Sequence, residues 1–168
     1  MTEENTTDPI KDALRMIPYG FYSITTSDGE GEVNIMVANW LSQVSFTPRL
    51  VALGLQKTSY SHGLVEKGRV FAVNLFRKED DRIIKRFTKS RERNPDKVSE
   101  AEFTLSPTVG CPVIAGAAAV LEVKVREIVD AGGDHDVVIG EVVNAEVFKP
   151  GDCAETLTLM DLGWSYAG

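Results

Sequence analysis

The chain has 168 residues, a length typical of one domain, and 43% of them are hydrophobic, which excludes a disordered chain. Its net charge of -7 argues against a general nucleic-acid binder, and no apolar run approaches the roughly 18 residues that a membrane span needs. Only two cysteines are present, too few for a disulfide framework, so we expect a cytoplasmic protein with neither nucleic acid nor membrane as partner.

The first part of the chain predicts a tail, a helix and five strands. Residues 1–9 are expected to form a flexible tail, and the apolar spacing of residues 10–17 predicts a short helix. Aromatic and β-branched residues then predict five strands, at residues 21–26, 33–38, 43–46, 50–56 and 70–76. An Asp-Gly turn joins the first two strands and indicates a hairpin.

Two helices are expected among the later strands. Residues 59–67 predict a short helix. Residues 79–89 begin with acids and end with bases, which suits the helix dipole, and residues 90–102 are expected to form a mobile polar loop. Between residues 77 and 97, nine basic side chains outnumber five acidic ones, which gives +4. Such a segment either attracts a phosphorylated ligand or is simply a solvated surface.

Two long strands complete the predicted fold, at residues 118–129 and 136–148, with a glycine-rich turn at residues 131–134 between them. Strand signals outnumber helix signals, and most connections are too short to contain a crossover helix. The sequence therefore predicts a mainly β, antiparallel barrel that residues 10–168 form as a single domain.

Motifs of common hydrolases and nucleotide-binding proteins are missing from the sequence. It contains no Gly-x-Ser-x-Gly elbow, no P-loop and no Gly-x-Gly-x-x-Gly fingerprint between a strand and a helix. The only histidines are His62 and His135, and His62 has no neighbours in the sequence that suggest a metal site. We therefore expect no metal, and no ATP or dinucleotide bound through the usual α/β routes.

Three segments can carry chemistry, although each also has a purely structural explanation. Residues 34–48 leave one strand and enter the next, so they either expose backbone groups to a flat heterocycle or form a bulged strand. Residues 56–61 place hydroxyls, a lysine and free amides at a helix N-terminus, which suits either a phosphate or a plain N-cap. His135 follows a tight turn at the head of a strand, where a lone histidine is more often structural. Two glycines before it and the sequence Gly-Glu-Val at residues 140–142 favour a functional role.

Together, the three segments resemble the flavin reductase-like family of FMN-binding split barrels, over residues 17–166. The motifs that carry the resemblance are Met36-Val37-Ala38-Asn39, Val44-Ser45-Phe46-Thr47-Pro48, Val73-Asn74-Leu75, Gly133-Asp134-His135 and Gly140-Glu141-Val142. Their order and spacing together are fairly specific. Trp40 makes the chain similar to the flavoredoxin-type and flavodiiron-associated branch of this family.

The resemblance implies a Greek-key-like split β-barrel, flanked by a few short helices, that forms a homodimer with one FMN per subunit. It implies contacts with the flavin ring from Val37, Ala38, Asn39, Trp40, Leu41, Gln43, Val44 and Ser45. It also implies contacts with the phosphate or the rest of the cofactor from Gln56, Lys57, Thr58, Ser59, Ser61, Asn74 and Phe87. His135 is the implied catalytic residue, beside the nicotinamide or the open face of the flavin.

The activity implied by the resemblance is reduction of FMN by NADH or NADPH, with FMN either held as a prosthetic group or released as a product. Flavin carries this redox chemistry, so the protein needs no nucleophile or strong base of its own. A flavoredoxin-type electron carrier, with a redox protein as its donor, is the main alternative. A pyridoxamine-phosphate-oxidase-like or heme-related split barrel is a third reading, which the Gly-Asp-His segment disfavours, and a flavin-free dimeric scaffold is a fourth.

Overall fold

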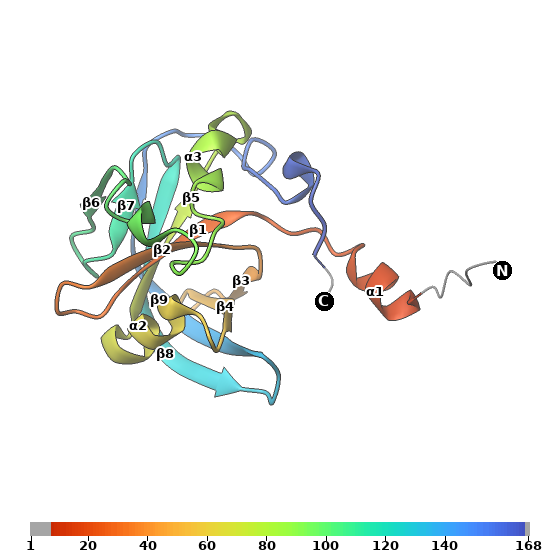
Figure 1. Cartoon of the computed structure of the whole chain (residues 1–168), viewed down its shortest axis with the longest axis horizontal. Coiled ribbons are helices and arrows are strands. Elements are labelled where there is room, and N and C mark those ends of the chain that lie inside the picture. The colour runs from red at the N-terminus through yellow and green to blue at the C-terminus, as the bar shows by residue number, and fades with distance from the viewer. Residues whose placement is uncertain (1–7, 167–168) are drawn as a thin grey trace.

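Seven antiparallel strands form the main sheet of the chain, in a computed structural model that describes residues 8–166. The sheet has the order β2-β1-β5-β8-β9-β4-β3 and curls on itself (Figure 1). Its strands are β1 (Tyr22–Ser27), β2 (Val33–Ala38), β3 (Leu41–Ser45), β4 (Leu50–Gln56), β5 (Val70–Leu75), β8 (Ala119–Asp130) and β9 (His135–Val147). β2 and β3 follow each other in the chain yet form opposite edges of the sheet, so the barrel stays open between them. The expected mainly β, split-barrel fold is confirmed.

The chain crosses the split through only two residues, Asn39 and Trp40. The Trp40 carbonyl accepts a hydrogen bond from the Gly54 amide at 2.8 Å, which ties the crossing to β4. The approach is close, because a Cβ on Gly54 would lie 3.1 Å from the Trp40 Cβ. The crossing therefore lies at the opening of the barrel, half-buried rather than packed in the core.

Short helices flank the sheet. They are α1 (Pro9–Leu14), α2 (Tyr60–Gly68) and α3 (Asp81–Lys85), with the 3-10 turns η1 (Lys78–Asp80), η2 (Pro95–Lys97) and η3 (Met160–Leu162). The Asp8 carboxylate caps α1, because it accepts hydrogen bonds from the Ile10 and Lys11 amides at 3.1 Å each. Residues 1–7 of the expected tail lie outside the described residues. Within residues 8–166, none of the helices has the length and apolar character needed to cross a bilayer.

Several predicted elements differ from the structure in their extent. The helix expected at residues 79–89 is a 3-10 turn followed by the five residues of α3, since the Phe87 amide already bonds the Ile84 carbonyl in a 3-10 pattern. The loop expected at residues 90–102 contains η2. Two strands of three residues each, β6 (Phe103–Leu105) and β7 (Pro112–Ile114), form a separate pair that the sequence did not predict. Strands this short show too little alternation to be recognised.

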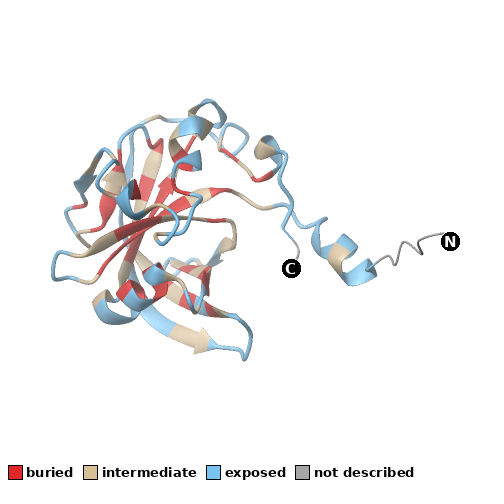
Figure 2. Cartoon of the chain, viewed as in Figure 1, coloured by how far each residue is buried: buried red, intermediate tan, exposed pale blue. Residues whose placement is uncertain are grey.

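The buried apolar residues form two large clusters and a smaller third one around Cys111, and Figure 2 marks in red where the ribbon is buried. One large cluster fills the curled sheet and includes Leu53 and Phe71, both fully buried. The other joins the end of β5 and α3 to the C-terminal segment through Phe76, Ile84 and Leu157. The Leu157 amide donates to the Phe76 carbonyl at 2.9 Å, so the C-terminal segment is anchored against the sheet.

The hairpin of β8 and β9 depends on two glycines. Gly132 in its turn has a φ of +84°, which residues with a side chain rarely adopt. Gly140 pairs with Val125, and a Cβ there would lie 2.3 Å from the Val123 Cγ1. Glycine at these positions therefore permits the tight turn and the close approach of β9 to β8.

Candidate functional site

A cleft of about 970 Å³ opens beside the crossing at residues 39–40. It is bounded by β2, the end of β4, the first turn of α2, the segment 87–97, the start of β9 and the C-terminal segment. Ligand pockets in proteins commonly occupy about 300–1,000 Å³. The cleft is therefore large enough for a cofactor with its substrate.

Ten of the residues singled out from the sequence line this cleft. They are Val37, Ala38, Asn39, Trp40, Gln56, Thr58, Ser59, Ser61, Phe87 and His135. The fold thus brings the β2 edge, the β4–α2 loop and the β8–β9 hairpin to one place. Their individual contacts with a cofactor stay predictions.

Four of the predicted flavin-contacting residues lie outside the cleft, on strand β3. They are Leu41, Gln43, Val44 and Ser45. In the described part of the chain β3 pairs only with β4, and Val44 is 53% exposed. The strand leads away from the cleft once the chain has passed the crossing, so a single chain does not bring these side chains to the site.

Asn74 has a structural position in β5, away from the cleft. Its side chain is fully buried and donates hydrogen bonds to the Thr25 hydroxyl and the Pro112 carbonyl at 3.3 Å each. Its Oδ1 accepts a hydrogen bond from the Ile114 amide at 2.9 Å. The amide group therefore joins β1, β5 and β7, and its own hydrogen-bonding capacity is used within the fold.

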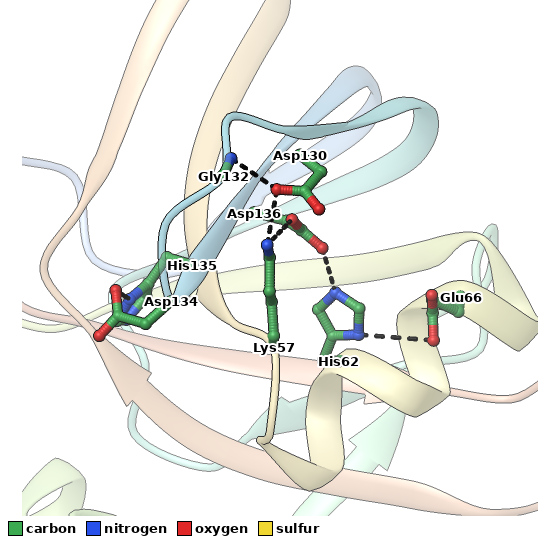
Figure 3. A network of polar contacts seen from close by, with 8 residues as sticks. All are labelled: Lys57, His62, Glu66, Asp130, Gly132, Asp134, His135 and Asp136. Atoms are coloured by element: carbon green, nitrogen blue, oxygen red, sulfur yellow. Dashed lines mark hydrogen bonds and ion pairs between the residues drawn. The ribbon is translucent and has the colours of Figure 1, made fainter.

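Lys57 also lies outside the cleft, with its ammonium group held by carboxylates. Its Nζ is 2.6 Å from the Asp130 Oδ1 and 3.6 Å from the Asp136 Oδ1 (Figure 3). The hydrogen bond to Asp130 raises the pKa of Lys57. Lys57 lies in the turn that follows β4, and its ammonium group is directed to these carboxylates rather than to the cleft that Gln56 and Thr58 line.

The first turn of α2 presents hydrogen-bond donors to the cleft. Ser59 caps the helix, because its Oγ accepts a hydrogen bond from the His62 amide at 3.2 Å. The backbone amides that follow Ser59 belong to the first turn of α2, where amides have no acceptor within the helix. The buried Ser61 hydroxyl accepts a hydrogen bond from the Asn34 Nδ2 at 2.9 Å. A helix N-terminus arranged in this way favours an anion.

Three cations from the segment after α3 line the same cleft, namely Lys89, Arg91 and Lys97. Lys97 is only 4% exposed, and its ammonium group donates to the Lys89 carbonyl at 3.0 Å. Burial, and then the charge of Arg91, lower the pKa of Lys97. An anion in the cleft would compensate this buried charge. The basic character of residues 77–97 left a phosphorylated ligand and a solvated surface both open, and no signal in the sequence singled out Lys97.

Arg91 anchors this segment over the cleft. Its guanidinium carbon lies 4.3 Å from the centre of the Tyr60 ring, and its Nη1 lies 2.7 Å from the Glu32 Oε1. The same nitrogen donates to the Val33 carbonyl at 3.2 Å. The segment expected to be a mobile loop is therefore tied to α2 and to β2.

Aromatic rings form one wall of the cleft. Trp40 meets His135 at a centroid distance of 4.8 Å and Tyr166 at 5.4 Å, both edge to face. Trp164 packs edge-on against Phe21 at 5.7 Å. Nothing in the sequence indicates that the C-terminal aromatic residues lie beside Trp40, so their part in the cleft was not predicted.

His135 is the first residue of β9 and lies opposite Gln56 of β4. Its Nδ1 is 2.8 Å from the Asp134 Oδ1, and this hydrogen bond lowers the pKa of Asp134. The His135 side chain is 23% exposed. The imidazole therefore reaches the cleft with one nitrogen held by its neighbour in the turn.

Two buried polar atoms of cleft-lining residues, Asn34 Oδ1 and Asn39 Nδ2, have no hydrogen-bond partner within residues 8–166. Buried polar groups in native proteins are nearly always hydrogen-bonded, and an unpaired one costs about 1–3 kcal/mol. One acceptor and one donor are therefore available to a polar ligand in the cleft.

Comparison with known proteins gives a consistent picture. The chain matches the flavin reductase like domain over residues 14–163. It is 33% identical over 152 residues to a ferric-chelate reductase (NAD(P)H) of Archaeoglobus fulgidus, covering 89% of this chain and 86% of that protein. Among solved structures, an NADH:FAD oxidoreductase of Streptomyces globisporus superposes with a TM-score of 0.74 at 25% identity, covering 88% of this chain and 87% of that one.

Some relatives are longer than this chain. A high molecular weight rubredoxin of Moorella thermoacetica is 31% identical over 142 residues, which cover 83% of this chain but 61% of that protein. The chain spans only 46% of the length of another relative, from Aeropyrum pernix. The domain match nevertheless includes almost every segment that lines the cleft, from β2 to the end of η3. The chain therefore belongs to the flavin reductase-like family.

Proposed function

We propose that this chain is an NAD(P)H-dependent flavin reductase that holds FMN in the cleft beside Trp40. The observation that carries the proposal is that one cleft combines an unpartnered amide donor and acceptor with a buried, unneutralised cation. FMN offers the matching groups, since it has a flat polar ring at one end and a phosphate at the other. The names of the two relatives, a ferric-chelate reductase (NAD(P)H) of Archaeoglobus and an NADH:FAD oxidoreductase of Streptomyces, support a reduced nicotinamide nucleotide as electron donor.

The phosphate end of the proposed site lies at the first turn of α2. Ser59 and Ser61 supply hydroxyls there, and the adjacent amides carry the positive end of the helix dipole. Lys97 and Arg91 supply positive charge from the opposite side of the cleft. These four residues, rather than Lys57, are the proposed phosphate ligands.

The ring end of the proposed site lies at the crossing between β2 and β3. The Asn39 Nδ2 donor at this crossing has no partner within residues 8–166, as the polar edge of a heterocycle requires, whereas Asn34 adjoins Ser61 at the phosphate end. Val37, Ala38 and Trp40 supply apolar contacts beside this donor. The residues present therefore fit a flavin.

A flavin held by these residues would supply the redox chemistry, namely acceptance of a hydride from reduced nicotinamide. The chain's own residues bind and orient the two partners, an effect worth several kcal/mol of the barrier. The unpartnered Asn39 amide supports a role for this residue in stabilising negative charge at the ring edge. His135 and Trp40 form the wall against which a nicotinamide nucleotide packs, and His135 acts by position and charge rather than as an obligatory acid.

Purified protein tests the proposal directly. We expect it to bind FMN with a shift of the flavin absorbance, and we expect the 450 nm band to bleach when NADH or NADPH is added under anaerobic conditions. Parallel titrations with FAD and riboflavin decide which flavin the cleft prefers. Protein that binds no flavin, or that holds FMN without oxidising either nucleotide, contradicts the proposed reductase.

A second candidate function is electron transfer between FMN and a protein donor. The match to a high molecular weight rubredoxin favours it, because a segment similar to this chain there covers 61% of a longer protein that is named as a rubredoxin. Reduced rubredoxin distinguishes the two functions when it replaces NAD(P)H in the anaerobic experiment. Fast bleaching by rubredoxin with negligible oxidation of either nucleotide supports the carrier.

A homodimer and a cytoplasmic location complete the proposal. The edge strand β3 carries Val44, which is 53% exposed, and leads to Phe46, which is 87% exposed. A second copy of the chain would cover this edge and bring the β3 residues to a site. Cys111 and Cys153 are both unpaired, which accords with a reducing compartment.

A further inference from the structure

Behind the cleft lies a network of charged side chains. Lys57, His62 and Asp136 each belong to a segment that lines the cleft, but none of the three side chains lines it. Figure 3 shows how they converge beneath the β8–β9 turn, together with Asp130. The network is formed across the sequence, since Asp136 and His62 are 74 residues apart.

Asp136 is the centre of the network. Its Oδ2 lies 2.7 Å from the His62 Nε2, and its Oδ1 lies 3.6 Å from the Lys57 Nζ. Lys57 donates in turn to the Asp130 Oδ1 at 2.6 Å, and that oxygen also accepts the Gly132 amide at 2.7 Å. The side chains of His62 and Asp136 are only 8% and 9% exposed. Removing one of them leaves the other buried without its partner.

Three members of the network, Lys57, His62 and Asp136, are each the immediate neighbour of a cleft-lining residue. Asp136 follows His135 in β9, so the two side chains point to opposite faces of the strand. His62 follows Ser61 in the first turn of α2, and Lys57 lies in the loop that leads to this turn. Holding the hidden side chains together therefore holds the cleft-lining ones at a fixed separation.

We propose that Lys57, His62 and Asp136 are positioning residues that join His135 and the first turn of α2 into one unit. The inference rests on the proposed function, in which His135 serves the nicotinamide nucleotide and the α2 turn serves the FMN phosphate. A displacement of about 1 Å in such orienting groups can cost about a hundredfold in rate. The network therefore makes each end of the site sensitive to changes at the other.

The test measures the binding or kinetic constant of each end of the site in a variant that is changed at the opposite end. The variant His62→Leu replaces the imidazole on α2 with an apolar side chain of similar volume. We expect its kcat/KM for NAD(P)H to fall about tenfold at saturating FMN. In Asp136→Asn, on the His135 strand, we expect the Kd for FMN to rise about tenfold. His62→Gln keeps a nitrogen that can donate to Asp136, and we expect it to recover kcat/KM to within about twofold of wild type.

Arg126→Gln is the matched control, because it removes an exposed ion pair with Glu141 from the same hairpin. We expect it to leave both constants unchanged. Should the His62 variants not fold, Lys57→Met takes their place, since the Lys57 side chain is 30% exposed. Lys57→Met should raise the KM for NAD(P)H, although Lys57 lies in the loop that leads to the proposed phosphate site at α2.

The outcomes separate this inference from the proposed function. If His62→Gln and His62→Leu behave alike, or if each constant changes only at its own end of the site, the positioning network is refuted. This holds even when the wild type binds FMN and oxidises NAD(P)H normally. If the wild type does neither, the proposed function fails first, and the inference fails with it.

Discussion

Two lysines, Lys57 and Lys97, show how side-chain direction decides which cation can reach a ligand. Lys57 lies beside cleft-lining residues in the sequence but turns towards Asp130 and Asp136. Lys97 comes from a polar segment without a distinct motif, yet its ammonium group is buried at the cleft. The prediction that a lysine binds the phosphate therefore transfers from the first lysine to the second.

Lys97→Met tests this assignment, because it removes the charge and keeps the length of the side chain. Charge-assisted hydrogen bonds are worth about 1.5–3 kcal/mol, so we expect FMN affinity to fall by about tenfold to a hundredfold. Riboflavin lacks the phosphate, and its affinity should barely change. Fluorescence titrations measure both. Lys85→Met, at an exposed lysine paired with Asp81 in the same basic segment, is the control. An equal loss for both flavins would show that Lys97 acts on the fold.

His135→Ala tests the other end of the cleft. The variant should still bind FMN, because His135 packs against Trp40 and does not belong to the proposed phosphate or ring-edge groups. We expect kcat/KM for NAD(P)H to fall about tenfold, which corresponds to about 1.4 kcal/mol. Steady-state kinetics and a melting curve on the same preparation distinguish binding from stability. Unchanged kinetics in a folded, FMN-loaded variant would remove His135 from the site.

At the scale of elements, the β8–β9 hairpin requires glycine at Gly132 and Gly140 but tolerates a side chain at Gly133. A Cβ on Gly140 would lie 2.3 Å from the Val123 Cγ1, whereas one on Gly133 would meet no atom within 4 Å. We expect Gly140→Ala to lower the free energy of unfolding by about 1–3 kcal/mol through overpacking. Gly133→Ala should change it little. Urea unfolding of the two variants provides the comparison, and equal stabilities would contradict the close packing of β9.

Sequence patterns predicted the long elements well because their signals are local. Alternation over residues 118–129 and 136–148 placed both long strands within one or two residues of β8 and β9. Contacts between distant segments gave no such signal. Nothing near His62 in the sequence indicates an acidic partner with a functional role. The fold nevertheless places the Asp136 carboxylate 2.7 Å from the His62 Nε2. The sequence likewise gave no signal that Trp164 and Tyr166 reach the cleft. They do so through a C-terminal segment that Leu157 anchors.

At the scale of the whole molecule, the split barrel leaves one side of its site open. β2 and β3 form the two edges of the sheet, and the chain passes from one to the other through Asn39 and Trp40. The first of these strands lines the cleft, whereas β3 does not. The residues that, by the family resemblance, are expected to contact the flavin thus lie on both sides of the opening. A second subunit that covers β3 would reconcile the two sets.

The uncovered edge of β3 therefore predicts that two chains assemble. We expect the chain to form a dimer, with twice its mass of 18.4 kDa in light scattering. Val44→Asp places a carboxylate on the exposed apolar part of β3, where burial against a partner would be costly, so the dimer should dissociate. FMN affinity should fall together with the mass if β3 completes the site of the other subunit. Leu105→Asp, at an exposed leucine on β6 away from this edge, should change neither quantity. A monomeric Val44→Asp protein with unaltered FMN affinity would show that one chain holds the flavin alone, and would remove the β3 residues from the site.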